Sequence, residues 1–418
     1  MCKSTCLSFN SKFNDFGYPC RVNKDSKDFL KISTPSKSSL QTRKSEKWRA
    51  YPHDILPMPF AVMDYDLAQP IKDALINLVE ASDAGYLGKF PELGESLSAF
   101  AKYKWGWDLD PADVKICPDV GVGVIEVCRQ IVKPGDFIMI NTPVYFNFIN
   151  WINELQCKAF DVPLIENELS YSLNFKEIED GYASGVKVHI LCNPHNPVGA
   201  VFPKDDLARL ADLAARYGVV IAADEIHAPL VFAETKFTPF LTSSQIAREV
   251  GIAFLSATKS WNIAGLKCAQ IVAVEDNTRE LIKQIPNAVH SRASLFGAVA
   301  SSTAYRECGD WLNSLVNQLD KSRYYLADQL ARLDESIGYK VPSAGYFGWL
   351  DMRKLELRHA IHGQNELADL LLSQGRLAVA PGKLYGPGGV GFIRINFATS
   401  FEILDDALNR IGSTIKTL

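Results

Sequence analysis

The chain has 418 residues, of which 47% are hydrophobic and 22% are charged, so it holds enough apolar material for a sizeable core. Its net charge of −4 gives no overall positive field that would attract nucleic acid or an anionic membrane. No run of 18 apolar residues predicts a membrane span, and the first residues lack the apolar segment of a secretion signal. The nine cysteines are scattered without a Cys-x-x-Cys pair, so we expect the free thiols of a cytoplasmic protein and no metal site.

We expect four parts along the chain. Residues 1–44 are rich in serine and carry nine basic and three acidic residues, which predicts a loosely packed N-terminal extension. We expect residues 45–84 to be an N-terminal segment that packs with a small domain. A large ligand-binding domain is expected over 85–305, and the small C-terminal domain over 306–418.

Short apolar runs and amphipathic stretches alternate through the large domain. The helical pattern over 203–218 begins near an acidic first turn and stops at Gly218. This alternation predicts an α/β fold, with a mostly parallel central sheet and helices on both faces. A long helical pattern over 311–333, followed by shorter strands, predicts a smaller α+β C-terminal domain. The runs that predict buried strands, all rich in Val, Ile, Phe or Ala, are 136–143, 188–194, 218–225, 252–258 and 270–275.

Polar residues follow three of these predicted strands. Asn193, Asp224 and Lys259 each stand at or just beyond the end of an apolar run. Ligands of parallel sheets bind beyond the carboxyl ends of the strands, so these side chains could share one site, although an Asp and a Lys could also form a simple salt bridge. No Gly-x-Gly-x-x-Gly fingerprint follows a first strand, which argues against a nicotinamide enzyme.

The local sequences around these residues are more specific than their positions. NPHNPVG at 193–199, DEIH at 224–227 and SATKSWNIAGL at 256–266 resemble, in this order and spacing, the fold-type I pyridoxal-phosphate (PLP) enzymes. Within this class I and II aminotransferase superfamily, the chain is most similar to the MalY/PatB-type cystathionine β-lyases. The resemblance runs from about Arg43 to the C-terminus and implies the PLP-dependent transferase-like fold.

The resemblance assigns catalytic roles to Lys259, Asp224 and Tyr145. Lys259 would form the Schiff base with the cofactor and later take the Cα proton of the substrate. Asp224 would face the pyridine nitrogen, and Tyr145 would stack on the ring. Asn193 would donate to the phenolic oxygen, and His227 would face the cofactor's edge.

The phosphate of the cofactor would need backbone N–H groups, a hydroxyl and a cation. Val120 and Gly121 begin a predicted helix, whose N-terminus is a suitable anion site. Ser256 would supply the hydroxyl and Lys267 the positive charge. Tyr86 would reach the phosphate from a second subunit, which implies a homodimer with shared active sites.

The substrate side is expected at Arg394, Asn193, Ala61, Val62 and Asp119. Arg394 matches the arginine of the family that binds the substrate carboxylate. Val62 and Asp119 depart from the family, which usually has Asp and Gly at these positions. Asp119 could serve as the N-cap of the helix that begins near Val120, or it could meet a cationic or hydroxylated substrate side chain.

The implied activity is that of a PLP-dependent lyase acting on an L-amino acid. It would proceed through an external aldimine and Cα deprotonation to an α,β-elimination, as in C–S β-lyases. One alternative is elimination followed by cyclisation or replacement on a hydroxylated or guanidino amino acid. Others are an aminotransferase and a regulatory protein that keeps the cofactor for stability.

Overall fold

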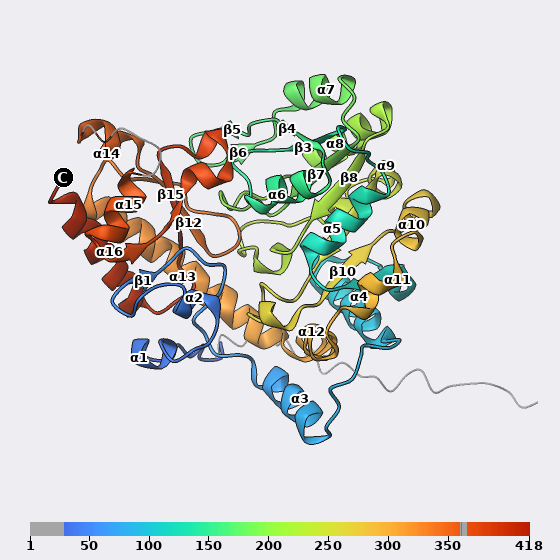
Figure 1. Cartoon of the computed structure of the whole chain (residues 1–418), viewed down its shortest axis with the longest axis horizontal. Coiled ribbons are helices and arrows are strands. Elements are labelled where there is room, and N and C mark those ends of the chain that lie inside the picture. The colour runs from blue at the N-terminus through green and yellow to red at the C-terminus, as the bar shows by residue number, and fades with distance from the viewer. Residues whose placement is uncertain (1–28, 360, 362–365) are drawn as a thin grey trace, which may run out of the picture.

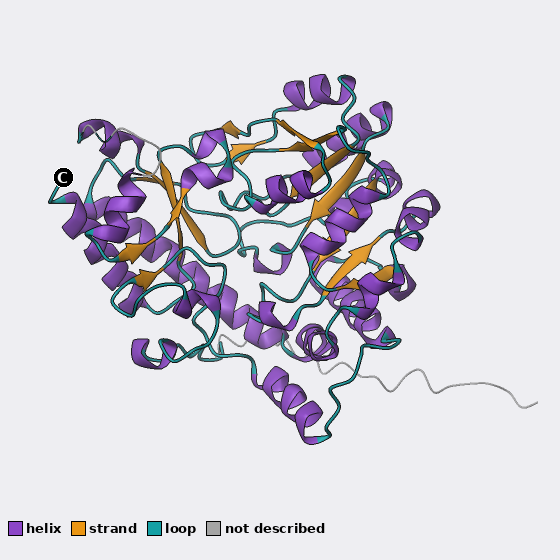
Figure 2. Ribbon diagram, in the orientation of Figure 1, coloured by secondary structure: helices purple, strands orange, loops and turns teal. Residues whose placement is uncertain are grey.

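The computed structural model describes residues 29–359, 361 and 366–418 of the chain (Figure 1). Its elements gather around a seven-stranded sheet from the middle of the chain and a four-stranded sheet from its last third (Figures 1 and 2). Within the described ranges, no helix is long and apolar enough to cross a membrane.

The seven-stranded sheet is mostly parallel, as the sequence predicts. Strand β10 runs antiparallel to both of its neighbours, and the other six strands run in one direction. The five predicted strands are all present, whereas the strands at the two edges of the sheet were not predicted. In order across the sheet the strands are β2 (Val114–Cys117), β10 (Ala269–Val272), β9 (Gly251–Leu255), β8 (Val220–Asp224), β7 (Val188–Cys192), β3 (Phe137–Ile140) and β4 (Lys158–Asp161).

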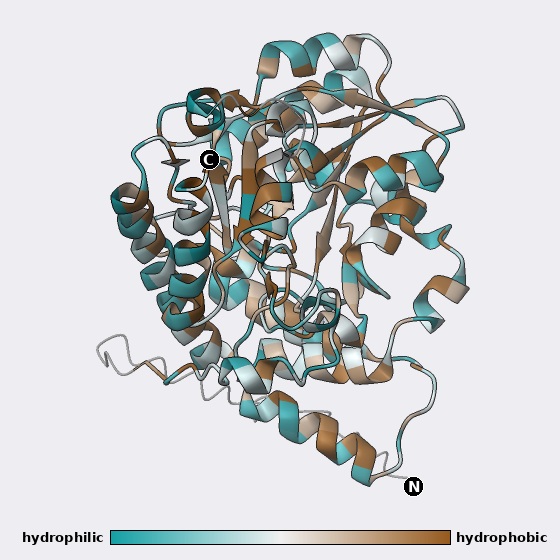
Figure 3. Ribbon diagram, turned by 60° about the vertical axis from the view of Figure 1, so that its left-hand side comes forward, coloured by the Kyte–Doolittle hydropathy of each residue, from teal (hydrophilic) through white to brown (hydrophobic). Residues whose placement is uncertain are grey.

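Apolar side chains cover both faces of this sheet, so the central strands are mostly brown in Figure 3. In β9, Ile252 and Phe254 pack on one face, while Ala253 and Leu255 pack on the other, because successive side chains of a strand alternate. The first face is covered by α5 (Val120–Arg129) and α6 (Asn147–Glu154), and the second by α4 (Pro91–Trp105), α8 (Lys204–Tyr217) and α12 (Leu295–Glu307).

Helix α8 shows why the sequence forms these helices. Its first turn carries Asp205 and Asp206, which favour the positive end of the helix dipole. The buried face repeats at helical spacing through Leu207, Leu210 and Ala214. The helix ends at Gly218, whose φ of 67° lies in the left-handed region that glycine adopts without strain.

The four-stranded sheet is antiparallel throughout. Its strands, in order, are β11 (Gly338–Tyr339), β12 (Phe347–Asp351), β15 (Phe392–Asn396) and β14 (Ala380–Pro381). The helices of this region are α13 (Gly309–Leu333), α14 (Arg353–Arg358), α15 (Glu366–Ser373) and α16 (Phe401–Ile415). The long helix expected over 311–333 is therefore present, and it packs against α16.

The N-terminal segment joins the region of the four-stranded sheet. Strand β1 (Leu56–Pro57) pairs in parallel with β13 (Leu377–Ala378), and α3 (Gln69–Glu80) then packs on α12 (Figure 1). The short helices before β1 are α1 (Lys37–Leu40) and α2 (Glu46–Arg49).

Part of the expected loose extension is packed. Residues 1–28 lie outside the described residues, but Leu40 is fully buried and the Lys37 ammonium lies 2.7 Å from the Asp406 carboxylate. The expected loose packing therefore does not hold at Leu40 and Lys37, which attach the segment to the rest of the protein, whereas Ser36, Ser38 and Ser39 are exposed. The remaining helices and strands are α7 (Phe175–Ala183), α9 (Gln245–Val250), α10 (Asp276–Lys283), α11 (Asn287–Ser291), β5 (Ile165–Glu166), β6 (Tyr171–Ser172) and the 3₁₀ helices η1 (Pro111–Asp113), η2 (Ala228–Leu230), η3 (Phe240–Thr242), η4 (Ala264–Leu266), η5 (Gly382–Tyr385) and η6 (Pro387–Gly389).

Candidate active site

A cavity of about 320 Å³ lies at the carboxyl edge of the seven-stranded sheet. Strands β2, β3, β7, β8 and β9 run in the same direction, so the loops that follow them meet at this edge. The sequence-predicted residues that line the cavity are Ala61, Asp119, Val120, Gly121, Tyr145, Asp224, His227, Lys259 and Lys267.

Lys259 follows β9 and brings an amine to this cavity. Burial lowers the pKa of the amine to about 8, with further lowering by the positive charges of Arg394 and Lys267. Asp224 and Asp119 act in the opposite direction. The Nζ atom donates a hydrogen bond to the carbonyl oxygen of Ala61 at 3.3 Å. Near neutral pH a useful fraction of this amine is therefore unprotonated and able to act as a base or nucleophile.

Asp224 is the last residue of β8, and its carboxyl group is almost fully buried. Burial raises the pKa of this carboxyl group to about 6, although the Ile226 N–H, which donates to Oδ1 at 3.1 Å, and the charge of Lys259 both lower it. A buried carboxylate with one backbone donor can accept another hydrogen bond from a cationic group in the cavity.

His227 lies three residues after Asp224 and also lines the cavity. Burial, followed by the charges of Lys259 and Arg394, lowers the pKa of its imidazole to about 3, so the ring is neutral. Its Nδ1 atom is buried and has no hydrogen-bond partner. The ring meets Tyr346 and Phe347 edge to face.

Tyr145 and Trp151 form an aromatic wall. Their ring centroids are 6.0 Å apart in a T-shaped arrangement, and the Tyr145 hydroxyl accepts a hydrogen bond from Asn147 at 2.6 Å. A Cβ atom added to Gly121 would come within 2.8 Å of the Trp151 ring. Gly121 therefore lets the N-terminus of α5 approach this wall closely.

Asp119 is the N-cap of α5, as one of its two predicted roles requires. Its Oδ1 atom accepts a hydrogen bond from the Val122 N–H at 2.9 Å, and its Oδ2 atom lies 3.1 Å from the ammonium of Lys267. Both carboxylate oxygens are thus engaged within the protein. The alternative role, contact with a substrate side chain, stays a prediction.

Arg394 lies in the centre of β15 and is buried. Its Nη1 atom donates to Asn196 Oδ1 at 2.9 Å, and its Nη2 atom donates to the carbonyl oxygen of Pro59 at 2.5 Å. The guanidinium also lies 4.0 Å from the ring centroid of Phe347, while its Nε atom is buried without a partner. Asn196 links Arg394 to the cavity, because Asn196 is a lining residue and its Oδ1 atom accepts the hydrogen bond from Arg394.

Two predicted cofactor contacts differ from the geometry. Asn193 does not line the cavity; its Oδ1 atom accepts the Phe202 N–H at 3.0 Å, and its buried amide nitrogen has no hydrogen-bond partner. Asn196, three residues later, does line the cavity. Ser256 is also absent from the lining, because its hydroxyl donates to the Cys268 carbonyl at 2.8 Å and is bonded to Thr258. Thr258 lines the cavity instead.

Besides Arg394, which is not itself part of the lining, two further predicted residues lie away from the cavity of this chain. The Val62 carbonyl accepts hydrogen bonds from Asn396 at 2.8 Å and Lys47 at 3.3 Å, and its side chain is not part of the lining. Tyr86 is 94% exposed. Its predicted contact with a second subunit is not tested by a single chain.

Among the lining residues that sequence reasoning missed are four with polar or aromatic side chains, Asn147, Trp151, Asn196 and Thr258. Asn196 could have been considered, since it repeats the Asn-Pro dipeptide of Asn193 three residues later. Asn147, Trp151 and Thr258 stand one to six residues from a predicted site residue, and no motif in the sequence around them indicates a role in the site.

Comparisons with known proteins find matches that cover most of the chain. A family model for aminotransferases of class I and II matches residues 59–411. The chain is 31% identical to cystathionine β-lyase of Corynebacterium glutamicum over 383 residues, which cover 91% of the chain and 99% of that protein. It is 28% identical to cystathionine β-lyase PatB of Bacillus subtilis over 364 residues, covering 87% and 93%. The structure of cystalysin from Treponema denticola, which contains pyridoxal 5′-phosphate, matches with a TM-score of 0.87 at 24% identity, over 93% of this chain and 100% of that one.

Proposed function

We infer that this chain, which belongs to the aminotransferase class I and II family, is a PLP-dependent lyase that breaks a carbon–sulfur bond of an L-amino acid. The observation that carries this inference is the placing of Lys259 and Asp224 in one cavity, with a depressed amine pKa and a buried carboxyl group. The reaction is an α,β-elimination that releases a thiol. The names of the relatives above support this reaction over transamination.

The residues of the cavity fit pyridoxal phosphate. Lys259 offers a partly neutral amine for the aldehyde, and Asp224 offers a buried carboxylate with spare acceptor capacity for the pyridine nitrogen. The N-terminus of α5 at Val120 and Gly121, together with Lys267, suits the phosphate. When bound, the cofactor withdraws electrons from the Cα atom of an attached amino acid, so that the Cα proton becomes removable.

The chain's own residues then have distinct tasks. The neutral amine of Lys259 takes the Cα proton, because burial keeps part of it unprotonated near pH 7. Arg394 binds the α-carboxylate, and its hydrogen bond to the Pro59 carbonyl holds the guanidinium in place for this contact. The Lys259 ammonium formed by the first step then lies in the cavity as the proton source for the departing thiolate.

Product analysis tests the function. Purified protein with added cofactor should convert cystathionine to pyruvate, ammonia and homocysteine in equal amounts, and Lys259→Ala should abolish the conversion. Formation of an amino acid from an added 2-oxo acid, without pyruvate release from cystathionine, would instead identify an aminotransferase.

We also propose a cytoplasmic homodimer in which Tyr86 completes the phosphate site of the partner. Its 94% exposure leaves the phenol free for such a contact, and Ile76 and Val79 of α3 are also exposed apolar residues. The six described cysteines are free and buried, which is common in a reducing compartment.

Subunit mixing tests the dimer. Tyr86→Ala and Lys259→Ala should each be impaired alone, whereas mixed subunits should regain activity, because a hybrid dimer contains one intact site. A lack of recovery in hybrids whose formation is shown by native mass spectrometry would contradict a shared site.

A further inference from the structure

The loop from Pro59 to Met63 has no regular secondary structure, yet each of its five carbonyl oxygens accepts a hydrogen bond from a side chain. Such a loop has its shape set by the donors around it rather than by its own sequence. The donors are Arg394 for Pro59 (2.5 Å), Asn396 for Phe60 (2.7 Å), Lys259 (3.3 Å) and Tyr346 (3.2 Å) for Ala61, Asn396 (2.8 Å) and Lys47 (3.3 Å) for Val62, and Asn262 (3.0 Å) and Arg43 (3.5 Å) for Met63.

Two of these donors are the cations that the proposed reaction uses. Lys259 follows β9 of the seven-stranded sheet, and Arg394 belongs to β15 of the four-stranded sheet. The loop therefore joins both sheets at the cavity, and the carbonyl oxygens of Ala61 and Pro59 set where the amine and the guanidinium rest. A displacement of the loop moves both acceptors together.

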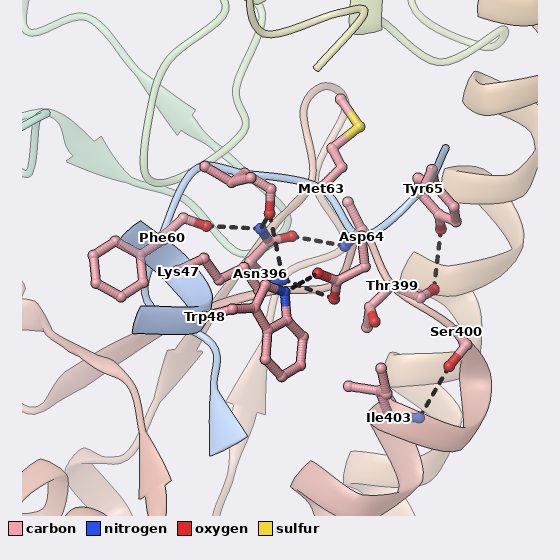
Figure 4. Close-up of polar contacts among 12 residues, drawn as sticks. Lys47, Trp48, Phe60, Met63, Asp64, Tyr65, Asn396, Thr399, Ser400 and Ile403 are labelled. Carbon is pink, nitrogen blue, oxygen red and sulfur yellow. Dashed lines mark hydrogen bonds and ion pairs between the residues drawn. The ribbon is translucent and has the colours of Figure 1, made fainter. Parts of the chain in front are cut away.

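Behind the loop, Lys47 and Asp64 form an ion pair at 2.8 Å, and both side chains are 0% exposed. Figure 4 shows Lys47 and Trp48, from the short helix α2, converging on the Asp64 carboxylate. Trp48 Nε1 donates to Oδ1 at 2.9 Å, so each carboxylate oxygen has its own donor. The Asp64 N–H donates to the Ala398 carbonyl at 3.0 Å, which ties this end of the loop to the residues after β15.

Lys47 also acts on the loop directly. The same ammonium that pairs with Asp64 donates to the Val62 carbonyl, one residue beyond Ala61. A buried cation here is costly to desolvate, and replacement of a buried pair by apolar residues often leaves stability unchanged or higher. Stability alone is therefore a weak explanation for a charged pair at this position.

We propose that Lys47 and Asp64 are positioning residues for the reaction: their ion pair holds the Pro59–Met63 loop so that its carbonyl oxygens orient Lys259 and Arg394. This inference rests on the proposed function, since it assigns the two residues to the same site. Loosening the pair shifts the Ala61 and Pro59 acceptors, which changes the protonation of the group at Lys259 and the binding of the substrate carboxylate by Arg394.

The test compares two buried-pair variants with a matched control in the holoenzyme. Lys47→Met removes the ammonium but keeps a chain of similar shape, and the double variant with Asp64→Asn avoids an unpaired buried carboxylate. The control is Lys37→Met, which breaks another Lys–Asp pair between the N-terminal segment and α16, at 2.7 Å and partly exposed, with no contact to the loop. Each protein is measured for thermal stability, for the pH midpoint of the visible absorbance of its bound cofactor, and for KM and kcat with the amino-acid substrate.

Lys47→Met should shift the absorbance midpoint by about half a pH unit or more and raise KM about tenfold or more, as small displacements of positioned groups do. The double variant should regain thermal stability but keep both changes, because it still lacks the Val62 contact. Lys37→Met should leave the midpoint and KM at the wild-type values.

A loss of thermal stability in Lys47→Met with an unchanged midpoint and KM would overturn the inference, as would equal changes in Lys37→Met. Full recovery of KM and midpoint in the double variant would also overturn it, since the effect would then come from an unpaired charge alone. A wild-type protein without a visible cofactor band would refute the proposed function itself, which separates that failure from this one.

Discussion

The acidity of Lys259 gives a prediction that can be measured without turnover. Burial lowers the pKa of this amine from the ordinary 10.5 to about 8, and the cations of Arg394 and Lys267 add to the effect. The difference of about 2.5 units corresponds to about 3 kcal/mol in favour of the neutral amine. At pH 7 about a tenth of the amine is then neutral, roughly 300 times the fraction expected for an ordinary lysine.

The experiment varies the pH of a solution of the cofactor-free protein. Trace acetic anhydride labels neutral amines, and peptide mass spectrometry follows the label on Lys259 from about pH 6 to pH 11. Labelling should have its midpoint at about 8. Arg394→Met should raise the midpoint because a neighbouring positive charge is removed, and Asp224→Asn should lower it because a negative charge is removed.

The lowered pKa of Lys259 also makes the stability of the fold depend on pH. The folded protein holds the Lys259 proton less tightly than the unfolded chain, so this residue disfavours folding below pH 8, and the penalty fades as the pH rises towards 10.5. A labelling midpoint at or above about 10, the value of an ordinary lysine, would refute the argument that the cavity prepares a neutral base.

Three further predictions concern other parts of the structure. Asp224→Ala should lower kcat roughly 100-fold, since the buried partner of the pyridine nitrogen is lost, and near wild-type turnover would contradict this role. Asp119→Ser keeps an N-cap, but it removes a negative charge beside the proposed phosphate site and releases Lys267 from its ion pair. Equilibrium titration should therefore show cofactor binding that is tighter by up to about fivefold, and unchanged or weaker binding would contradict this prediction. Leu40→Ala should reduce the free energy of unfolding by about 2–5 kcal/mol, because the side chain is fully buried, while Leu30→Ala, at a 54% exposed position, should change it little in denaturant titrations.

The sequence predicted the central strands because both faces of the sheet are covered. Strands such as β7 and β9 are buried at every position, so they appear as continuous apolar runs. The edge strand β4 is partly exposed along its length and reads Lys-Ala-Phe-Asp, which carries no such signal. The same difference between central and edge positions explains why five strands were found and two were missed.

The candidate site was predictable where a side chain and a strand end coincide, as for Asp224 and Lys259. The site could not be predicted where two similar residues lie close together in the sequence and only one of them faces the cavity. Asn193 and Asn196 both precede a proline, and only the fold shows that the first is bonded to Phe202 while the second meets Arg394.

Hydrogen bonds to backbone carbonyl oxygens are even harder to predict from a sequence than side-chain contacts. The acceptors for Lys259 and Arg394 are carbonyl oxygens of Ala61 and Pro59, and any residue supplies a carbonyl oxygen. The pair of Lys47 and Asp64 joins two ordinary charged residues 17 positions apart, and only their complete burial distinguishes them from surface charges.

The central claim is that the amine of Lys259 holds the cofactor in the cavity beside Asp224. Borohydride reduction of the holoenzyme, followed by peptide mass spectrometry, tests this claim most directly. The account predicts that the reduced cofactor is found on the peptide containing Lys259 and that Lys259→Ala yields no modified peptide. Attachment to another lysine, or equal labelling of Lys259→Ala, would contradict it.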